Sequence, residues 1–444
     1  MSDIYNVDLP TDGTTVRQKS LDYTLFTWSP QKNLKTFEIR KAAGCYYWDY
    51  DGKKYFDLCS QLICVNIGHG NQKVINAIKK QAETLTYVKP KFTTDIRGAA
   101  AEKIITCFAP KNMKKVLFSL GGAESNEYAI RLAKTATGRT KIFSQYNSYH
   151  GATYGAANLC GDIDRNVSDP QIGGFIHFFG PNYRDGNAAR FETSDQEADF
   201  YLKMLEDQLI FEGPSRVAAI FLEGMTGGNG LIVPGKRYMQ GVRKLCDKYG
   251  ILLVIDEVMT GFGRTGKNFC VDYYDINPDM ITFAKGVTSA YMPLGGVILS
   301  ESLSDYFDEV GVPIGCTYNS HPMCCAAALA NLEVLEDEQL VSNAYNKGLA
   351  IQERLSQLIQ IHPSMQEQRG LGLARGFLVH ESLRGRKELS KIFNEFAALG
   401  CPTNGNNGII IVAPPLIVND SQIEYITDVI DQVMSPMDVL VSNV

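Results

Sequence analysis

The feature that most constrains this chain is an apolar run at residues 251–255 that ends abruptly in Asp256. A run of this length, rich in branched side chains and bounded by polar residues, is typical of a strand buried in a parallel sheet. About thirty residues later a second, mainly apolar run at 280–284 ends in Lys285. Ligands of open α/β sheets bind beside the carboxyl ends of the strands. We therefore expect Asp256 and Lys285 to meet at one edge of such a sheet.

An acid and an amine in this arrangement suit a particular chemistry. An amine can form a covalent Schiff base, and a carboxylate can keep a pyridinium nitrogen protonated. We therefore predict that Lys285 and Asp256 are catalytic residues. A single charged residue at a strand end is usually no more than a solvated charge, so the prediction depends on the spacing of the pair.

The residues around this pair resemble the class III aminotransferases, which are pyridoxal-phosphate enzymes with the aspartate aminotransferase fold. The resemblance is clearest at 253–266 and 284–286, and weaker motifs extend it from about Thr24 to the end of the chain. It implies an α/β fold of PLP fold type I, with a mostly parallel seven-stranded sheet in a large domain and a small α+β domain. The expected divisions are an N-terminal arm and small-domain hairpin at 1–70, a large PLP-binding domain at 71–325, and a C-terminal small domain at 326–444.

The resemblance also implies a phosphate site. A short strand at 116–119 is followed by glycines and a helix start. The first amides of a helix have no internal partner and suit an anion, although glycines at such turns are also common for steric reasons. We expect the backbone of Gly122 and Ala123 to bind the cofactor phosphate. Thr317 is expected to reach the phosphate of a neighbouring subunit, which makes the enzyme a homodimer with a shared active site.

Three further residues are expected around the cofactor ring. By resemblance, Tyr149 stacks on one face of the ring, and Val258 lies against the other because alternate strand residues share a face. Glu223 follows another buried run at 217–222. In the family the matching glutamate lies beside the cofactor and can bind an active-site arginine.

The substrate class follows from resemblance alone. Met259 and the segments 148–153, 295–297 and 319–322 look most like enzymes that act on taurine, β-alanine or similar ω-amino acids. Such an enzyme moves an amino group from this donor to a 2-oxo acid, either 2-oxoglutarate or pyruvate, by a ping-pong mechanism. Alternatives with the same fold are an aminomutase, a racemase, a decarboxylating transaminase or another ω-amine transaminase.

Many relatives place an arginine where this chain has Asn404. That arginine grips the acceptor carboxylate, so another cation or amide groups must replace it here. The candidate substrate residues are Trp28, Arg165 and Arg375, although Trp28 could instead anchor the N-terminal arm and Arg165 could be a surface arginine. Arg165 lies in the stretch 162–206, which is polar, weakly patterned and expected to be a surface excursion.

Residues 261–266 match the pattern G-x-G-x-x-G of dinucleotide-binding turns. A NAD oxidoreductase is therefore the alternative from another enzyme class. The acidic pair before this segment and the aromatic and proline residues after it argue against that interpretation. A non-catalytic binding module is disfavoured because both Lys285 and Asp256 are present.

The composition argues against several other classes of protein. The charged fraction of 21% is that of a globular protein, and the net charge of -6 argues against nucleic-acid binding and gives no basic face for a membrane. The chain shows neither a signal-peptide pattern nor an apolar run long enough for a bilayer. The 11 cysteines have no metal-ligand spacing. We expect a cytoplasmic enzyme with small-molecule substrates and no metal.

Overall fold

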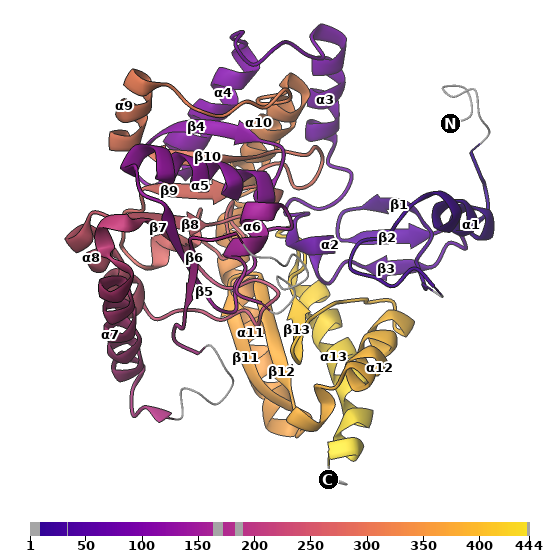
Figure 1. Ribbon diagram of the computed structural model, residues 1–444. Coiled ribbons are helices and arrows are strands. Elements are labelled where there is room, and N and C mark those ends of the chain that lie inside the picture. Colours follow the sequence, from indigo (N-terminus) through magenta and orange to yellow (C-terminus); the bar gives the residue numbers. More distant parts are fainter. Residues whose placement is uncertain (1–8, 33, 163–171, 183–189, 442–444) are drawn as a thin grey trace.

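The computed structural model describes residues 9–32, 34–162, 172–182 and 190–441. Its centre is a seven-stranded sheet in the order β4-β10-β9-β8-β7-β5-β6 (Figure 1). Only the two pairings that involve β10 are antiparallel, which confirms the mostly parallel sheet. The strands are β4 (Met113–Ser119), β5 (Lys141–Gln145), β6 (Phe175–Phe178), β7 (Val217–Glu223), β8 (Leu252–Asp256), β9 (Met280–Phe283) and β10 (Gly295–Ser300).

Both faces of this sheet are covered, so alternate side chains of one strand enter different cores. On β7, Ile220 and Leu222 belong to the core that includes residues of α7 (Ser194–Glu212) and α8 (Lys236–Tyr249). Ala219 and Phe221 belong to the opposite core, with residues of α5 (Gly122–Thr137) and α9 (Glu301–Val310). A strand buried on both faces has no polar face, which explains the continuous apolar runs in the sequence.

The stretch 162–206 was expected to be a surface excursion, and this expectation is wrong for much of it. It contains β6 and most of α7. β6 is a four-residue strand at the edge of the sheet, and most of it is only half-buried. α7 begins after Thr193, whose side chain accepts a hydrogen bond from the backbone N–H of Gln196. A short edge strand and a helix with a polar first turn leave little apolar pattern to recognise.

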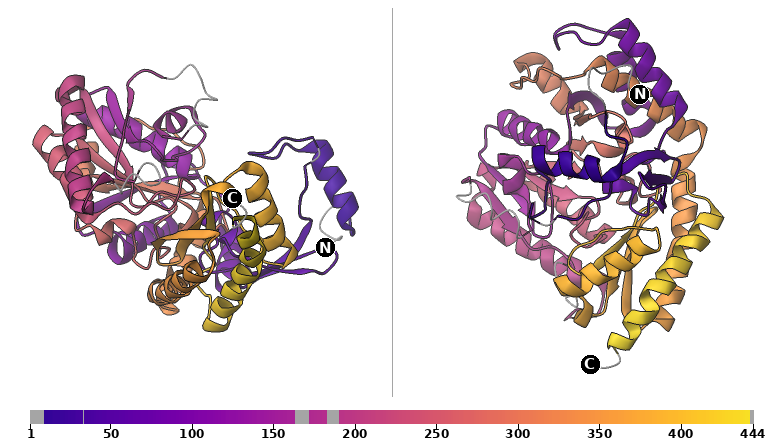
Figure 2. Two further views of the ribbon diagram at one scale, coloured as in Figure 1. Left: turned by 90° about the horizontal axis from the view of Figure 1, so that it is seen from below. Right: turned by 90° about the vertical axis from the view of Figure 1, so that its right-hand side faces the viewer.

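Two three-stranded antiparallel sheets lie beside the large one (Figures 1 and 2). The first contains the predicted hairpin around an Asp-Gly turn, with Tyr46 opposite Phe56. The first sheet is built of β1 (Ile39–Ala43), β2 (Tyr46–Asp49) and β3 (Lys54–Phe56), and the second of β11 (Met365–Leu371), β12 (Ala374–Val379) and β13 (Ile409–Val412).

Helices complete the two sides of the molecule. Helix α10 (Pro322–Asp337) packs against α3 (Gln72–Thr84) and α4 (Asp95–Lys103) of the large domain and leads into the C-terminal part. That part contains α11 (Leu340–Ile361), α12 (Arg386–Ala398) and α13 (Asp420–Val441). Helix α1 (Gly13–Tyr23) has no buried residue and lies at the outer edge of the molecule (Figure 2). The domain boundaries named above stay a prediction.

The glycine-rich segment 261–266 is a connection between the three sheets. It forms turns and opens no helix. Arg264 within it is fully buried, and its guanidinium donates hydrogen bonds to the carbonyls of Leu373 (2.8 Å) and Pro414 (2.6 Å). It also donates to Ser60 Oγ (3.0 Å) and Asn66 Oδ1 (2.9 Å). Burial lowers the pKa of Arg264 to about 10.

Replacing Arg264 with methionine is expected to destabilise the protein. The change leaves several buried acceptors without a donor, which should lower the free energy of unfolding by about 3 kcal/mol. Urea denaturation of the two proteins measures this difference. Arg237→Met is a matched control, because Arg237 binds Asp199 at the exposed surface and its loss should change stability little. Equal stability of the two variants would contradict the structural role of Arg264.

Candidate active site

A cavity of about 810 Å³ lies at the carboxyl ends of β7, β8 and β9. Strand register brings these ends level, because Glu223 pairs with Asp256 and Asp256 pairs with Thr282. The start of α5 and the loops after β5 and β8 complete one side. The other walls come from the two small sheets and their loops, including Leu62, Ile63, Cys64, Asn404 and Ile411.

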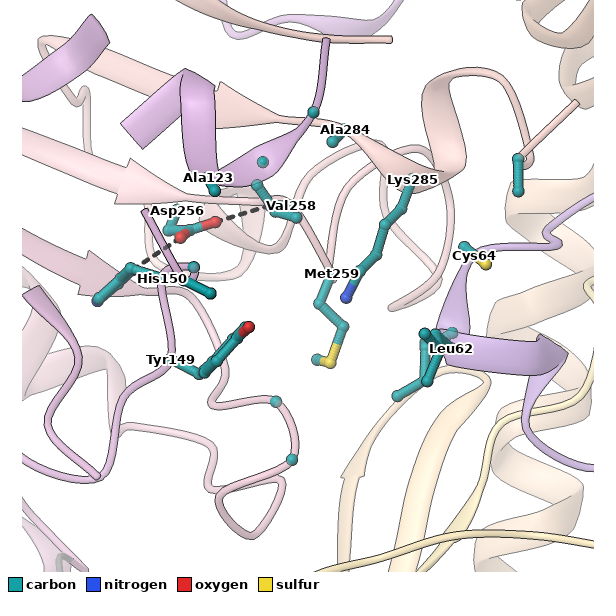
Figure 3. Close-up of a pocket in the computed structure, with 18 of the residues that line it drawn as sticks. Leu62, Cys64, Ala123, Tyr149, His150, Asp256, Val258, Met259, Ala284 and Lys285 are labelled. Carbon is teal, nitrogen blue, oxygen red and sulfur yellow. Dashed lines mark hydrogen bonds and ion pairs between the residues drawn. The ribbon is translucent and has the colours of Figure 1, made fainter. Parts of the chain in front are cut away.

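Asp256 is held in this cavity by three hydrogen-bond donors. Its Oδ2 accepts from Asn126 Nδ2 (2.8 Å) and lies 2.7 Å from His150 Nδ1, and its Oδ1 accepts from the backbone N–H of Val258 (2.9 Å) (Figure 3). Burial lowers the pKa of His150, but the hydrogen bond to Asp256 and its charge outweigh burial and raise it. The site therefore presents a carboxylate whose orientation is fixed by an imidazole, an amide and a backbone N–H.

Asn126 and His150 are functional residues to which the sequence analysis gave no role. Asn126 Oδ1 accepts a hydrogen bond from Thr282 Oγ1 (2.8 Å), so this side chain joins β9 to Asp256. A fully buried asparagine on the apolar face of α5 is the signal that could have found it. His150 directly follows Tyr149 in the sequence, but its contact with Asp256 depends on the order of the strands.

Lys285 lies two residues after the end of β9 and adopts a left-handed backbone conformation (φ 46°). Its side chain projects into the cavity, with Met259 on one side and Leu62 and Cys64 on the other (Figure 3). Desolvation in the cavity lowers the pKa of Lys285. A larger fraction of this amine is therefore neutral and able to act as a nucleophile or a base.

The predicted phosphate site is the start of α5, which begins at Gly122. The backbone N–H groups in the first turn of a helix have no partner within the helix. A Cβ atom at Gly122 would lie only 2.7 Å from Val258 Cγ1. Glycine is thus required where Val258 packs against the helix start, and the backbone of Gly122 and Ala123 lines the cavity.

Tyr149, Glu223 and Trp28 also line the cavity. The backbone N–H of Tyr149 donates to Glu223 Oε2 (3.3 Å), which ties the loop after β5 to the end of β7. Trp28 belongs to the N-terminal arm and is 73% exposed. A direct contact of Trp28 with substrate stays a prediction.

Two of the predicted residues that the structure describes, Arg375 and Thr317, are not among those that line this cavity. Arg375 is buried on β12, where it donates to Gln368 Oε1 (3.1 Å) and Gln352 Oε1 (2.7 Å), so a substrate role for it is not supported. Thr317 lies in an exposed turn, outside the described lining, and its role towards a neighbouring subunit stays a prediction. Arg165 lies outside the described residues.

Comparison with known proteins gives this geometry a family. The family model for class III aminotransferases matches residues 28–434. The chain belongs to this family. It is 30% identical over 405 residues to the putrescine–pyruvate aminotransferase of Pseudomonas aeruginosa, covering 87% of this chain and 88% of that protein. It is 30% identical over 451 residues to the taurine–pyruvate aminotransferase of Bilophila wadsworthia, covering 93% and 96%.

Solved structures of aminotransferases share the fold. The crystal structure of taurine:2-oxoglutarate aminotransferase from Bifidobacterium kashiwanohense, in complex with PLP and glutamate, superposes with a TM-score of 0.92. The two proteins are 37% identical, and the match covers 97% of this chain and 99% of that chain. The dinucleotide interpretation of residues 261–266 is set aside by this family membership.

Class III aminotransferases use pyridoxal phosphate, and the residues of this cavity fit it. Lys285 offers an amine whose pKa is lowered, as a covalent link requires. Asp256, held by three donors, offers the carboxylate that a pyridinium nitrogen needs. The start of α5 offers backbone N–H groups to a phosphate.

Within 9–32, 34–162, 172–182 and 190–441, no helix is long and apolar enough to cross a membrane. The same residues contain no cluster of histidine, cysteine and acidic side chains that could hold a metal ion.

Proposed function

We propose that this aminotransferase moves the amino group of an ω-amino acid to a 2-oxo acid by a ping-pong mechanism. Taurine is the favoured donor, with β-alanine or a related amine next, and the acceptor is 2-oxoglutarate or pyruvate. The observation that carries the proposal is the likeness to the taurine:2-oxoglutarate aminotransferase, at 37% identity over 97% of the chain. The taurine–pyruvate aminotransferase at 30% identity supports the same donor.

The residues of the cavity have distinct tasks in this reaction. Pyridoxal phosphate, when bound, supplies an electron-accepting ring. Lys285 Nζ would carry the covalent link to the cofactor, and in its neutral form the same amine would move the proton that the donor carbon loses. Asp256 would support the protonated ring nitrogen, and His150 and Asn126 hold the orientation of its carboxylate. The backbone N–H groups of Gly122 and Ala123 would bind the phosphate.

We also propose that the active form is a cytoplasmic homodimer with a shared active site. The exposed position of Thr317 supports the shared site, because its side chain is accessible to a partner. All eleven cysteines are free thiols, as expected in a reducing compartment. Sedimentation of the purified enzyme tests the dimer.

Half-reactions test the proposed donor and acceptor separately. With the cofactor-loaded enzyme, taurine should deplete the near-violet absorption band of the lysine-linked cofactor, and α-amino acids lacking an ω-amino group should not. Subsequent addition of 2-oxoglutarate or pyruvate should restore the band, and the faster of the two is the acceptor. If β-alanine or an aliphatic amine depletes the band while taurine does not, the taurine proposal fails. If no amine depletes it, the transaminase proposal itself fails.

A further inference from the structure

Two carboxyl groups share one end of the large sheet. Glu223 and Asp256 are the last residues of neighbouring strands β7 and β8, and they are paired in register. Residues paired in this way point their side chains to the same face of a sheet, and both line the cavity. Two adjacent carboxyl groups in a desolvated site cannot both ionise easily, so one tends to keep a proton.

The hydrogen bonds decide which group keeps the proton. Asp256 accepts from an asparagine amide, a raised-pKa imidazole and a backbone N–H. Among the described residues, Glu223 accepts only from backbone N–H groups, those of Gly227 at 3.1 Å and of Tyr149 at 3.3 Å, and the second of these bonds is long. Two carboxyl groups with such different hydrogen-bond partners tend to differ in protonation state. Glu223 is therefore the member of the pair with less support for a negative charge.

The surroundings of Glu223 also favour its protonated form. Burial, and then the charge of Asp256, raise its pKa to about 7, although His150 acts in the opposite direction. Other titratable groups near it in the described part of the chain are Lys285 after β9, whose pKa is lowered, Tyr149, whose pKa burial raises, and the thiol of Cys160 after α6 (Tyr154–Leu159), whose pKa is raised to about 12. None of these three supplies Glu223 with a strong cationic partner.

The described lining also lacks a dedicated cation for an anionic substrate. Lys285 is the one lysine or arginine among the described residues that line the cavity, and it is committed to the cofactor. The lining residue that comes from the loop before β13, Asn404, is neutral. An anionic substrate end therefore meets neutral hydrogen-bond donors in this part of the chain.

We propose that Glu223, in its protonated form, donates a hydrogen bond to the anionic end of a substrate and so determines which charge the cavity accepts. This proposal rests on the proposed function, which supplies a sulfonate or carboxylate as that anionic end. A neutral carboxyl that donates to an anionic oxygen makes a strong, charge-assisted hydrogen bond. Once Glu223 ionises, the same group repels the anion and attracts a distal ammonium group instead.

The sign of the pH effect follows directly. Below about pH 7 Glu223 is mostly protonated, so the cavity binds anions. Above that pH, each further pH unit lowers the affinity for an anion about tenfold. From pH 6 to pH 8.5 the affinity for an anionic probe should therefore fall by about 30-fold. A diamine such as putrescine should show the opposite trend, and propylamine, which has no charged distal group, should lack this contribution.

The test uses ethanesulfonate, which is taurine without its amino group, as a probe that cannot react. Its binding to the cofactor-loaded enzyme is measured by calorimetry at pH 6 and pH 8.5 for wild type, Glu223→Gln and Glu223→Ala. Glutamine is a neutral donor at every pH, so Glu223→Gln should bind the probe equally well at both. Glu223→Ala should bind it weakly at both. Glu424→Gln, at an exposed site on α13, is the matched control and should behave as wild type.

The outcomes separate this proposal from the proposed function. If Glu223→Gln keeps the pH dependence of wild type, or binds the probe as weakly as Glu223→Ala, the role of Glu223 is overturned. A wild type that does not bind ethanesulfonate at pH 6 overturns it as well. Because the probe does not react, these results hold whichever amine proves to be the donor. The half-reactions with taurine and β-alanine decide the donor independently.

Discussion

Replacing Lys285 with alanine will lower the transamination rate by about 10,000-fold or more, because one amine provides both the covalent link and the proton transfer. The variant will also lose the near-violet band of the lysine-linked cofactor, even when pyridoxal phosphate is added in excess. Its fold should persist, since Lys285 faces the cavity and does not fill a core. Steady-state rates and absorption spectra of the purified proteins measure both effects.

Lys267→Ala is the matched control for this change. Lys267 is exposed and lies on the connection between β8 and β9, and it does not line the cavity. It should keep both the band and the rate. A Lys285→Ala enzyme that retains the band would show that another amine holds the cofactor, and the site described here would be wrong.

Replacing Asp256 with asparagine will separate attachment of the cofactor from the rate of the reaction. The amine of Lys285 is untouched, so the near-violet band should remain. The rate should fall by about 1,000-fold, because the carboxylate that keeps the ring nitrogen protonated, and so allows the ring to accept electrons, is lost. Stopped-flow half-reactions with the donor, together with the absorption spectrum, measure the rate and the band on the same sample.

The control for this variant is Asp275→Asn, at an exposed aspartate that pairs with Lys236 on the surface. It should leave the half-reaction unchanged. Thermal unfolding of Asp256→Asn checks that the lost rate does not reflect a lost fold. A stable Asp256→Asn enzyme that reacts within tenfold of wild type would exclude Asp256 as the partner of the ring nitrogen.

The centre of the site was predictable because its signals are local in sequence. β8 and β9 are buried on both faces, so each is an apolar run that ends at the charged residue it presents. Asp256 and Lys285 could be read directly from those ends. The resemblance added Gly122 and Val258, and the structure gives the physical reason for that glycine in their close packing.

The supporting residues were not predictable in the same way. Asn126 on α5 and His150 after β5 contact Asp256 only because β5, β7 and β8 follow one another in the sheet. The order of strands in a sheet cannot be predicted from the local sequence pattern. Arg375 is the opposite case. It was a candidate because it is a cation, but its side chain on β12 donates hydrogen bonds to Gln368 and Gln352.

The bonds of Arg264 have a consequence for how the protein is made. Ser60 and Asn66, among the early residues to leave the ribosome, share this one guanidinium with Leu373 and Pro414, which emerge near the end of synthesis. The wall of the cavity around residues 60–66 therefore cannot reach its final form on a partly made chain. Until Leu373 and Pro414 have been made, the segment 60–66 and its apolar side chains lack part of their final packing, and exposed apolar surface of this kind is what molecular chaperones bind.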